Sequence, residues 1–328
     1  DIFDLGEDPG GWLGRPDDGP EDGVEEPTAV PADAETTDDA DHGQPESLVD
    51  RPALPGDVAV HYGMDLTERN GHLARPETFH GEPTREQAVQ GGLGDCGVIA
   101  ALGAVAGHRP EAVRDLIEPR QDGSHLVRLH DVRQSSPGVW EPTGRRIELA
   151  VTSDLPVSDT YPHYAAFANT YHTGVAWAAV LEKALAGSDA IWPPDRAAHS
   201  THRGYDRLHQ GTYPPDRTEL LALLTGQPAA TYAVDTTPGN EPAVERWLGE
   251  RLDARSPILV GTNSGDRYGL LPNRLVPSHA YEVVAASQGR ITLHNPWGDR
   301  HPPPMHVRDF LDNIVPFVST LRDQEENL

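Results

Sequence analysis

QGGLGDCGVIAAL, at residues 90–102, contains Cys96, the only cysteine among the 328 residues of the chain. A glycine-rich segment precedes the cysteine and small apolar residues follow it, which predicts that Cys96 begins a buried helix. The N-terminal end of a helix favours negative charge, so this position would lower the pKa of a thiol. A small cysteine that only packs in a core would give the same pattern. The stretch alone therefore leaves a catalytic and a structural role open.

The glycines of this segment also form a second motif. Gly92, Gly94 and Gly97 have the GxGxxG spacing of dinucleotide-binding loops, and Asp115 follows downstream. Such a loop must leave a buried strand before it enters its helix. The preceding residues 83–90, PTREQAVQ, are polar and show no strand pattern. We therefore do not expect a nucleotide cofactor here.

The composition excludes several classes of protein. The formal net charge is −26, so a phosphate backbone would be repelled and nucleic acid is not an expected partner. No apolar run approaches the length of a membrane span. One cysteine cannot form an internal disulfide, which fits a soluble protein that acts in the cytoplasm or is delivered into a target cell. Lys183 is the only lysine among 26 basic residues, a bias typical of GC-rich bacterial genomes.

The chain divides into four parts by composition. Residues 1–54 are predicted to be a disordered acidic linker, because they are rich in Asp, Glu, Pro and Gly and lack apolar periodicity. Helical patterns dominate residues 55–226, strand patterns dominate residues 227–322, and a short tail follows at 323–328. Helices are expected over 97–117, with a break at 107–110, and over 174–187, where the final glycine would be a C-terminal cap.

Two later segments supply what a cysteine nucleophile needs, a base and a group that orients it. His279 begins an apolar run, SHAYEVVAA, and Asn295 ends the next run, RITLHNPWG. If the two runs are neighbouring antiparallel strands, these side chains lie side by side. Asn295 would accept the imidazole N–H and fix its tautomer, and Trp297 would cover that hydrogen bond and exclude water.

Together, QGGLGDC, SHAYEVV and HNPWG resemble the protease core of the calpains, cysteine peptidases of the papain-like clan. The resemblance covers most of residues 75–320. It implies an α+β, two-lobed papain-like fold, with the site between a helical lobe and a β-rich lobe. It also implies that Cys96 is the nucleophile, that His279 is the general base and acid, and that Asn295 orients the histidine. The Gln90 side chain and the Cys96 backbone N–H would form the oxyanion hole.

The sequence departs from the calpain pattern at one position. Calpains usually carry a tryptophan directly after the cysteine, where this chain has Gly97. A bulky wall of the cleft would then be missing, which would change substrate preference. Calpain cores are also typically gated by calcium, so calcium is a candidate activator although the triad itself requires no cofactor. No EF-hand loop of the DxDxDG type appears, and the metal ligands stay unassigned.

The expected function is that of a calpain-like cysteine endopeptidase, which hydrolyses peptide bonds of protein or peptide substrates through a thioester acyl-enzyme. Deamidation or transglutamination by the same triad is an alternative, and a pseudo-protease that only binds peptides is another. An effector or toxin module is one biological role that fits this chemistry, and an inhibitor or immunity protein would then be its partner. The other biological role that fits is that of an intracellular regulatory protease.

Overall fold

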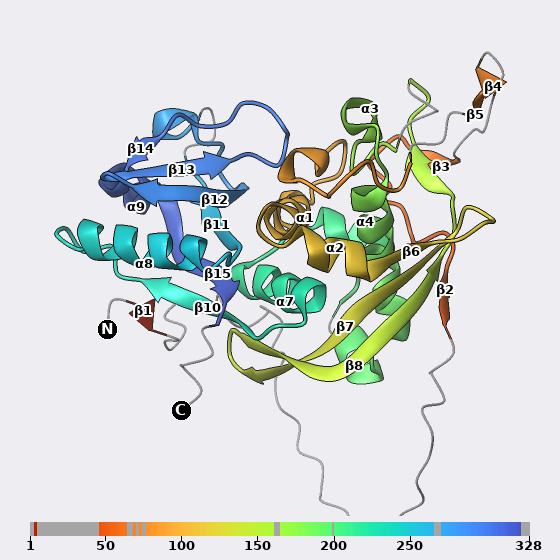
Figure 1. Cartoon of the computed structure of the whole chain (residues 1–328), viewed down its shortest axis with the longest axis horizontal. Coiled ribbons are helices and arrows are strands. Elements are labelled where there is room, and N and C mark those ends of the chain that lie inside the picture. Colours follow the sequence, from red (N-terminus) through yellow and green to blue (C-terminus); the bar gives the residue numbers. More distant parts are fainter. Residues whose placement is uncertain are drawn as a thin grey trace, which may run out of the picture.

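The computed structural model describes residues 3–4, 46–63, 68–69, 72–73, 77–160, 165–198, 200–265 and 270–322. Helices and strands are mixed along this part of the chain (Figure 1). The helices are α1 (Cys96–His108), α2 (Pro110–Leu116), α3 (Thr170–Thr173), α4 (Trp177–Gly187), α5 (Pro194–Ala198), α6 (Gly204–His209), α7 (Pro214–Thr225), α8 (Glu241–Asp253) and α9 (Val307–Asn313), with 3-10 turns η1 (Arg85–Gln87), η2 (Ser188–Ile191) and η3 (Pro272–Arg274). The strands are β1 (Phe3–Asp4), β2 (Ser47–Val49), β3 (His61–Gly63), β4 (Glu68–Arg69), β5 (His72–Leu73), β6 (Ile117–Pro119), β7 (His125–Ser136), β8 (Val139–Val151), β9 (Leu155–Val157), β10 (Ala229–Val234), β11 (Ile258–Thr262), β12 (Ala280–Ser287), β13 (Arg290–His294), β14 (Met305–His306) and β15 (Ile314–Leu321).

Within the described residues, an eleven-stranded sheet runs through the molecule. Its order is β14-β13-β12-β11-β15-β10-β8-β7-β6, with β1 paired to β10 and β2 paired to β8. The late strand β15 lies between β10 and β11, and it is antiparallel to both. β10 and β8 share only two residue pairs, at Ala229 and Ala230. The strands of the first and second halves of the chain are therefore joined by a narrow ladder.

Two large hydrophobic clusters lie on opposite faces of the inner strands. The larger one contains the side chains of α1, α4 and α7 together with those of β7 and β8. The smaller one contains side chains of α8, α9 and strands β11 to β15. Along β12, Ala280 belongs to the larger cluster, whereas Tyr281 and Val283 belong to the smaller one. In Figure 1, α1 is seen end-on at the centre, between the strands of the second half and α4.

The helix that was expected after the glycine-rich segment is confirmed. α1 begins at Cys96 and ends at His108, and α2 begins at Pro110 after a single intervening residue. Residues 97–106 are buried without a break, as a helix made of small apolar residues on all sides requires.

Two details differ from the sequence-based expectations for the first half. Gly187 ends α4 with a right-handed φ of −79°, so it is not a left-handed cap. Its lack of a side chain instead admits Val49 of β2, which a Cβ at residue 187 would collide with. Val49 is buried, so residues 46–54, which we assigned to the acidic linker, take part in the fold. Most of the remaining acidic segment lies outside the described residues.

The two longest strands, β7 with 12 residues and β8 with 13, belong to the first half of the chain, where the alternating apolar residues over 124–151 are typical of strands. In the described part of the chain, every helix is too short or too polar to cross a lipid bilayer.

Candidate active site

Cys96 lies where the N-terminus of α1 meets a strand from the other half of the chain. The carbonyl of the N-cap residue Asp95 accepts the N–H groups of Val98 and Ile99, at 2.8 and 3.2 Å. The backbones of Gly97 and Ala280 lie close enough to the Cys96 sulfur to lower the pKa of the thiol. Burial acts more strongly in the other direction, so the pKa of Cys96 is raised overall. Because Ala280 directly follows His279, this contact brings the thiol next to the predicted base.

The glycines before Cys96 are explained by close backbone packing. Gly91 N and Gly92 N donate to the carbonyls of Phe167 and Ala166, at 2.5 and 2.9 Å. A Cβ at residue 91 would collide with the Ala166 carbonyl oxygen. The 3-10 turn η1 precedes this segment in place of the buried strand that a dinucleotide loop needs. The GxGxxG spacing is therefore a packing feature.

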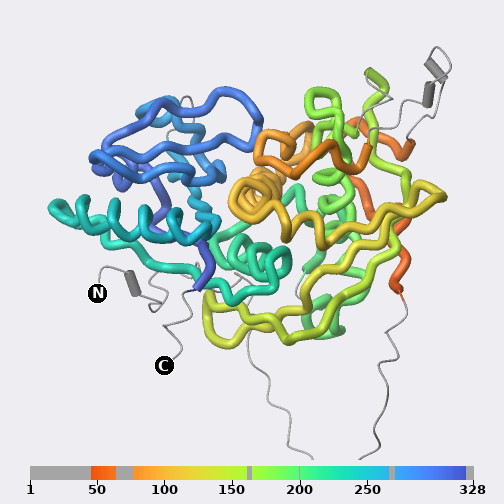
Figure 2. Tube along the Cα trace, in the orientation of Figure 1, coloured from red at the N-terminus to blue at the C-terminus, as the bar shows by residue number. Residues whose placement is uncertain are grey.

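Gln90 connects the loop before α1 to the loop that follows β13. Its backbone N–H donates to the carbonyl of Pro296 at 2.8 Å. Its side-chain Nε2 donates to the carbonyl of Leu93 at 2.7 Å, which uses one of the two amide hydrogens. Figure 2 shows the two loops side by side, in orange and in blue. The structure thus holds Gln90 beside the segment that contains Asn295.

His279 and Asn295 are brought together as the strand pattern predicted. β12 and β13 pair antiparallel, and His279 Nε2 lies 2.9 Å from Asn295 Oδ1. Asn295 is fully buried, and its Oδ1 also accepts the backbone N–H of Trp297 at 3.1 Å. Its Nδ2 donates to the carbonyl of Arg300 at 3.3 Å. Since Oδ1 is an acceptor, Nε2 must carry the imidazole hydrogen, and the neutral ring has its free lone pair on Nδ1.

The imidazole is enclosed by aromatic rings and held through its backbone. The ring of Trp297 lies 4.8 Å from that of His279, centre to centre, and the ring of Tyr281 packs edge-on at 4.9 Å. Thr262 of β11 accepts the His279 N–H on its Oγ1 at 3.0 Å and donates its own N–H to the His279 carbonyl at 2.9 Å. Burial lowers the pKa of His279, and the hydrogen bond to Asn295 raises it. The preceding Ser278 has a φ of 50°, a left-handed conformation that is costly for serine.

A buried ion cluster joins the two halves beside the site. Glu282, 1% exposed on β12, contacts Arg85 Nη2 at 3.0 Å and His108 Nε2 at 3.2 Å. Arg85 Nε also donates to the second carboxylate oxygen at 3.1 Å. The sequence analysis did not identify this cluster. In the sequence, the cluster was indicated only by the acidic residue Glu282 in the middle of the apolar run SHAYEVV. Strand alternation directs this residue toward α1.

A second buried acidic group lies behind the nucleophile. Asp95 and Glu182 of α4 are almost completely buried, and their carboxyl groups lie close enough for each to affect the pKa of the other. Glu182 Oε2 also accepts the backbone N–H of Ala168 at 3.0 Å. Burial raises the pKa of Asp95 to about 7, and burial together with the Asp95 charge also raises the pKa of Glu182. Both carboxyl groups therefore hold their protons more strongly than exposed carboxyl groups do.

Thr212 takes the space that Gly97 leaves. A Cβ at residue 97 would collide with the Thr212 hydroxyl, so a large side chain could not stand there without movement of the loop before α7. Thr212 therefore lies where the side chain of a tryptophan at residue 97 would begin. The effect on substrate preference stays a prediction.

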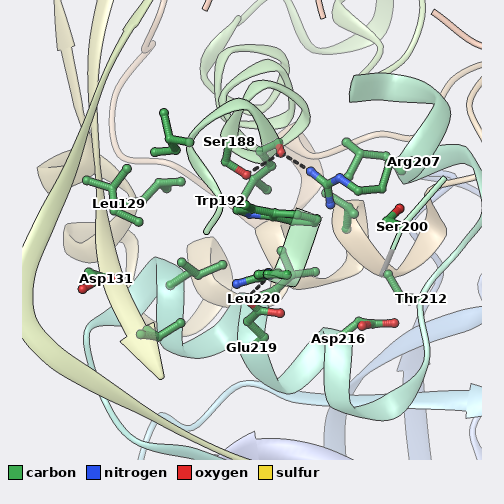
Figure 3. Close-up of a pocket in the computed structure, with 18 of the residues that line it drawn as sticks. Leu129, Asp131, Ser188, Trp192, Ser200, Arg207, Thr212, Asp216, Glu219 and Leu220 are labelled. Carbon is green, nitrogen blue, oxygen red and sulfur yellow. Dashed lines mark hydrogen bonds and ion pairs between the residues drawn. The ribbon is translucent and has the colours of Figure 1, made fainter. Parts of the chain in front are cut away.

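A cavity of about 1250 Å³ lies behind this loop, between β7, β8 and α7 (Figure 3). Thr212 lines one edge of it, whereas Cys96, His279 and Asn295 are not part of its lining. Its buried charges are already paired, as Arg207 Nε with Asp189 at 3.2 Å and Arg196 Nη2 with Glu219 at 2.5 Å. We assign this cavity no role in the chemistry.

Within the described ranges, no three His, Cys, Asp or Glu side chains are grouped as a bound metal ion would require. Calcium also takes backbone carbonyls as ligands, so its ligands stay unassigned and activation by calcium stays a prediction.

Comparison with known proteins assigns the sequence to a family. Residues 68–302 match the family described as "Calpain family cysteine protease". The chain is 26% identical to the calpain-2 catalytic subunit of Mus musculus over 272 residues, which is 75% of this chain and 34% of that protein. It is 24% identical to calpain-9 of Homo sapiens over 247 residues, 70% of this chain and 31% of that protein. The chain spans about a third of the length of these relatives. Because the family match covers well over half of the sequence, the protein belongs to the calpain family of cysteine proteases.

Proposed function

We propose that this protein is a cysteine endopeptidase, with Cys96 as nucleophile, His279 as base and acid, and Asn295 as the residue that orients the imidazole. The observation that carries the proposal is the fixed tautomer of His279, since Asn295 Oδ1 holds the hydrogen on Nε2. Nδ1 is then the nitrogen that can take the thiol proton. We also propose that the two large hydrophobic clusters are the cores of two lobes, with the site at their boundary.

The reaction follows from these positions. His279 Nδ1 takes the proton of Cys96, and the sulfur attacks the carbonyl carbon of the substrate. The second amide hydrogen of Gln90 and the Cys96 backbone N–H donate to the developing oxyanion. When the C–N bond breaks, the imidazolium protonates the leaving amine and a thioester remains. Water then gives a proton to Nδ1, attacks the thioester carbonyl carbon and releases the carboxylic acid and the thiol.

The first test is the variant Cys96→Ala, with wild-type protein and casein or a peptide library as substrates. Cleavage should fall to the background rate, while the thermal midpoint should change little because the substitution removes little buried volume. Cleavage at the wild-type rate would remove Cys96 from its assigned role.

The same preparation separates the alternative reactions. Ammonia release from glutamine side chains, or incorporation of an added amine, without new peptide termini would indicate deamidation or transglutamination. Labelling of Cys96 by a thiol probe without any turnover would indicate a pseudo-protease that binds peptides.

We propose for the biological role an effector or toxin module, which would harm the cell that makes it and would need an inhibitor or immunity protein. Cytoplasmic expression of wild-type protein should then arrest growth, and expression of Cys96→Ala at the same level should not. Equal growth of the two strains would favour an intracellular regulatory protease.

A further inference from the structure

Arg217 of α7 is a buried cation without an acidic partner. It is 4% exposed, and its Nη1 donates to the Thr212 carbonyl at 3.0 Å and to the Thr212 hydroxyl at 3.4 Å. Its Nε has no hydrogen-bond partner. Two neighbouring arginines, Arg196 and Arg207, each contact a carboxylate, but Arg217 forms no ion pair within the described part of the chain. A buried charge of this kind is costly unless an anion lies nearby.

The guanidinium lies between two backbone segments that are close in the fold to Cys96. On one side, its partner Thr212 packs against Gly97, which directly follows Cys96. On the other side, Arg217 Nη2 lies 3.1 Å from where a Cβ would stand at Gly261. Gly261 pairs with Ala280 across β11 and β12, and the Ala280 backbone lowers the pKa of the Cys96 thiol. Gly97 thus leaves room for Thr212, and Gly261 leaves room for the guanidinium that Thr212 holds.

The side chains of the triad do little to stabilise a Cys96 thiolate at this buried position. Asn295 is neutral, and burial disfavours both the Cys96 thiolate and the His279 imidazolium. The negative charge of Asp95 raises the pKa of Cys96 further, whereas the positive charge of Arg217 lowers it. Burial lowers the pKa of Arg217 to about 10, so the guanidinium stays protonated at neutral pH. The other titratable groups near this centre are His279, Tyr281, Asp216 and, beside Asp95, Glu182 and His209.

We infer that Arg217 is the charge partner of the nucleophile: its guanidinium stabilises the negative charge on the Cys96 sulfur. The inference rests on the proposed role of Cys96 and adds a positioning residue that lies outside the triad. Arg217 keeps its proton throughout the reaction, so the thiol proton still passes to His279 and then to the leaving amine.

The test uses the fact that the chain has one thiol. The rate of alkylation of Cys96 by iodoacetamide is measured from pH 5 to 10 in wild-type protein, Arg217→Gln, Arg217→Met and Arg217→Lys. Arg251→Gln is the matched control, since Arg251 is equally buried at 3% but lies on α8 in the other half. In the two neutral variants the apparent pKa of the thiol should rise by about one unit, so that alkylation below that pKa becomes about tenfold slower. Arg217→Lys should restore most of the wild-type profile, and Arg251→Gln should leave it unchanged.

A wild-type profile in a folded neutral variant would overturn the inference. If neither neutral variant folds, Thr212→Val replaces them, because it removes one anchor of the guanidinium with little change of volume. It should shift the profile in the same direction by less than one unit, and an unshifted profile would again contradict the inference. Peptidase activity is measured in parallel. An active wild-type enzyme with no shift in the variants refutes only the role of Arg217, whereas an inactive wild-type enzyme refutes the proposed function.

Discussion

The two sides of the candidate site are held in place by different kinds of interaction. On the β12–β13 side, His279 and Asn295 are neutral groups joined by short hydrogen bonds with a single arrangement of donors and acceptors. On the α1 side, the surroundings of Cys96 are dominated by buried charges, with Asp95 and Glu182 behind it and Arg217 beside it. The first side fixes geometry, and the second sets how readily the sulfur becomes an anion.

This contrast is clearest in the two buried glutamates. Glu282 contacts Arg85 and His108, whereas Glu182 lies beside another carboxyl group, and burial together with that group raises the pKa of Glu182. Both residues are 1% exposed, so the two glutamates differ in their neighbours and not in their burial. The contacts of Glu282 connect the two halves of the chain, and the raised pKa of Glu182 makes its environment sensitive to pH.

The largest effect is expected at Gln90, which belongs to both sides through its contacts with Leu93 and Pro296. Gln90→Ala removes a donor to the oxyanion, so kcat should fall by about a hundredfold while KM changes little. The measurement is steady-state hydrolysis of a peptide substrate, with Gln87→Ala in η1 as the control for loss of a neighbouring amide. An unchanged kcat would remove Gln90 from the oxyanion hole and leave it only as a connection between the loops.

A smaller effect is expected when the ion cluster between the halves is weakened. Glu282→Gln keeps the shape of the side chain but leaves Arg85 and His108 without a charged partner. The free energy of unfolding should fall by about 2 kcal/mol, as expected for hydrogen bonds to charged groups. Urea unfolding measures this, with the exposed Glu250→Gln on α8 as control. A stability equal to wild type would show that the cluster does not hold the halves together.

The neutral side of the site was far easier to predict from sequence than the charged side. His279 and Asn295 stand at the start and the end of two successive apolar runs, so strand pairing alone brings them together. Asp95, Glu182 and Arg217 come from three separate helices, and no periodicity along one element indicates that their charged ends converge. Glu182 did give a signal, since it interrupts the buried helix WAAVLEKALA, but its partner depends on how α1 packs against α4.

The acidic pair behind Cys96 should make stability depend on pH. The pKa of Asp95 is about 7 in the folded protein, against an ordinary value of 3.8. Between about pH 4 and pH 7, the unfolded chain releases this proton while the folded chain retains it, so the free energy of unfolding falls as pH rises. Burial also raises the pKa of Glu182, which adds a second contribution of the same sign, and Glu182→Gln removes that contribution. The fall in stability between pH 5 and pH 7.5 should therefore be smaller in this variant by about 1 kcal/mol.

Urea unfolding at the two pH values measures this difference, and Glu250→Gln is again a suitable control. A fall as steep as in the wild-type protein would mean that Glu182 contributes nothing to the pH dependence of stability. The acidic pair would then be only a packing feature, and the charged side of the site would depend on Arg217 alone.

The smallest effect is expected from calcium, and it tests whether the two sides are already aligned. The resemblance to calpains makes calcium a candidate activator, which would act by bringing Cys96 and His279 together. In this structure the Ala280 backbone already lies close enough to the Cys96 sulfur to affect its pKa, and the bond from Gln90 to Pro296 and the contacts of Glu282 join the halves. We therefore propose that hydrolysis proceeds at equal rates in EGTA and in millimolar calcium, with magnesium as a control for ionic strength. Activity that appears only with calcium would contradict this proposal, since the contacts between the halves would then be too weak to align the site. Equal hydrolysis rates in EGTA and calcium would mean that another form of control, such as an inhibitor partner, must restrain the protease in the cell that makes it.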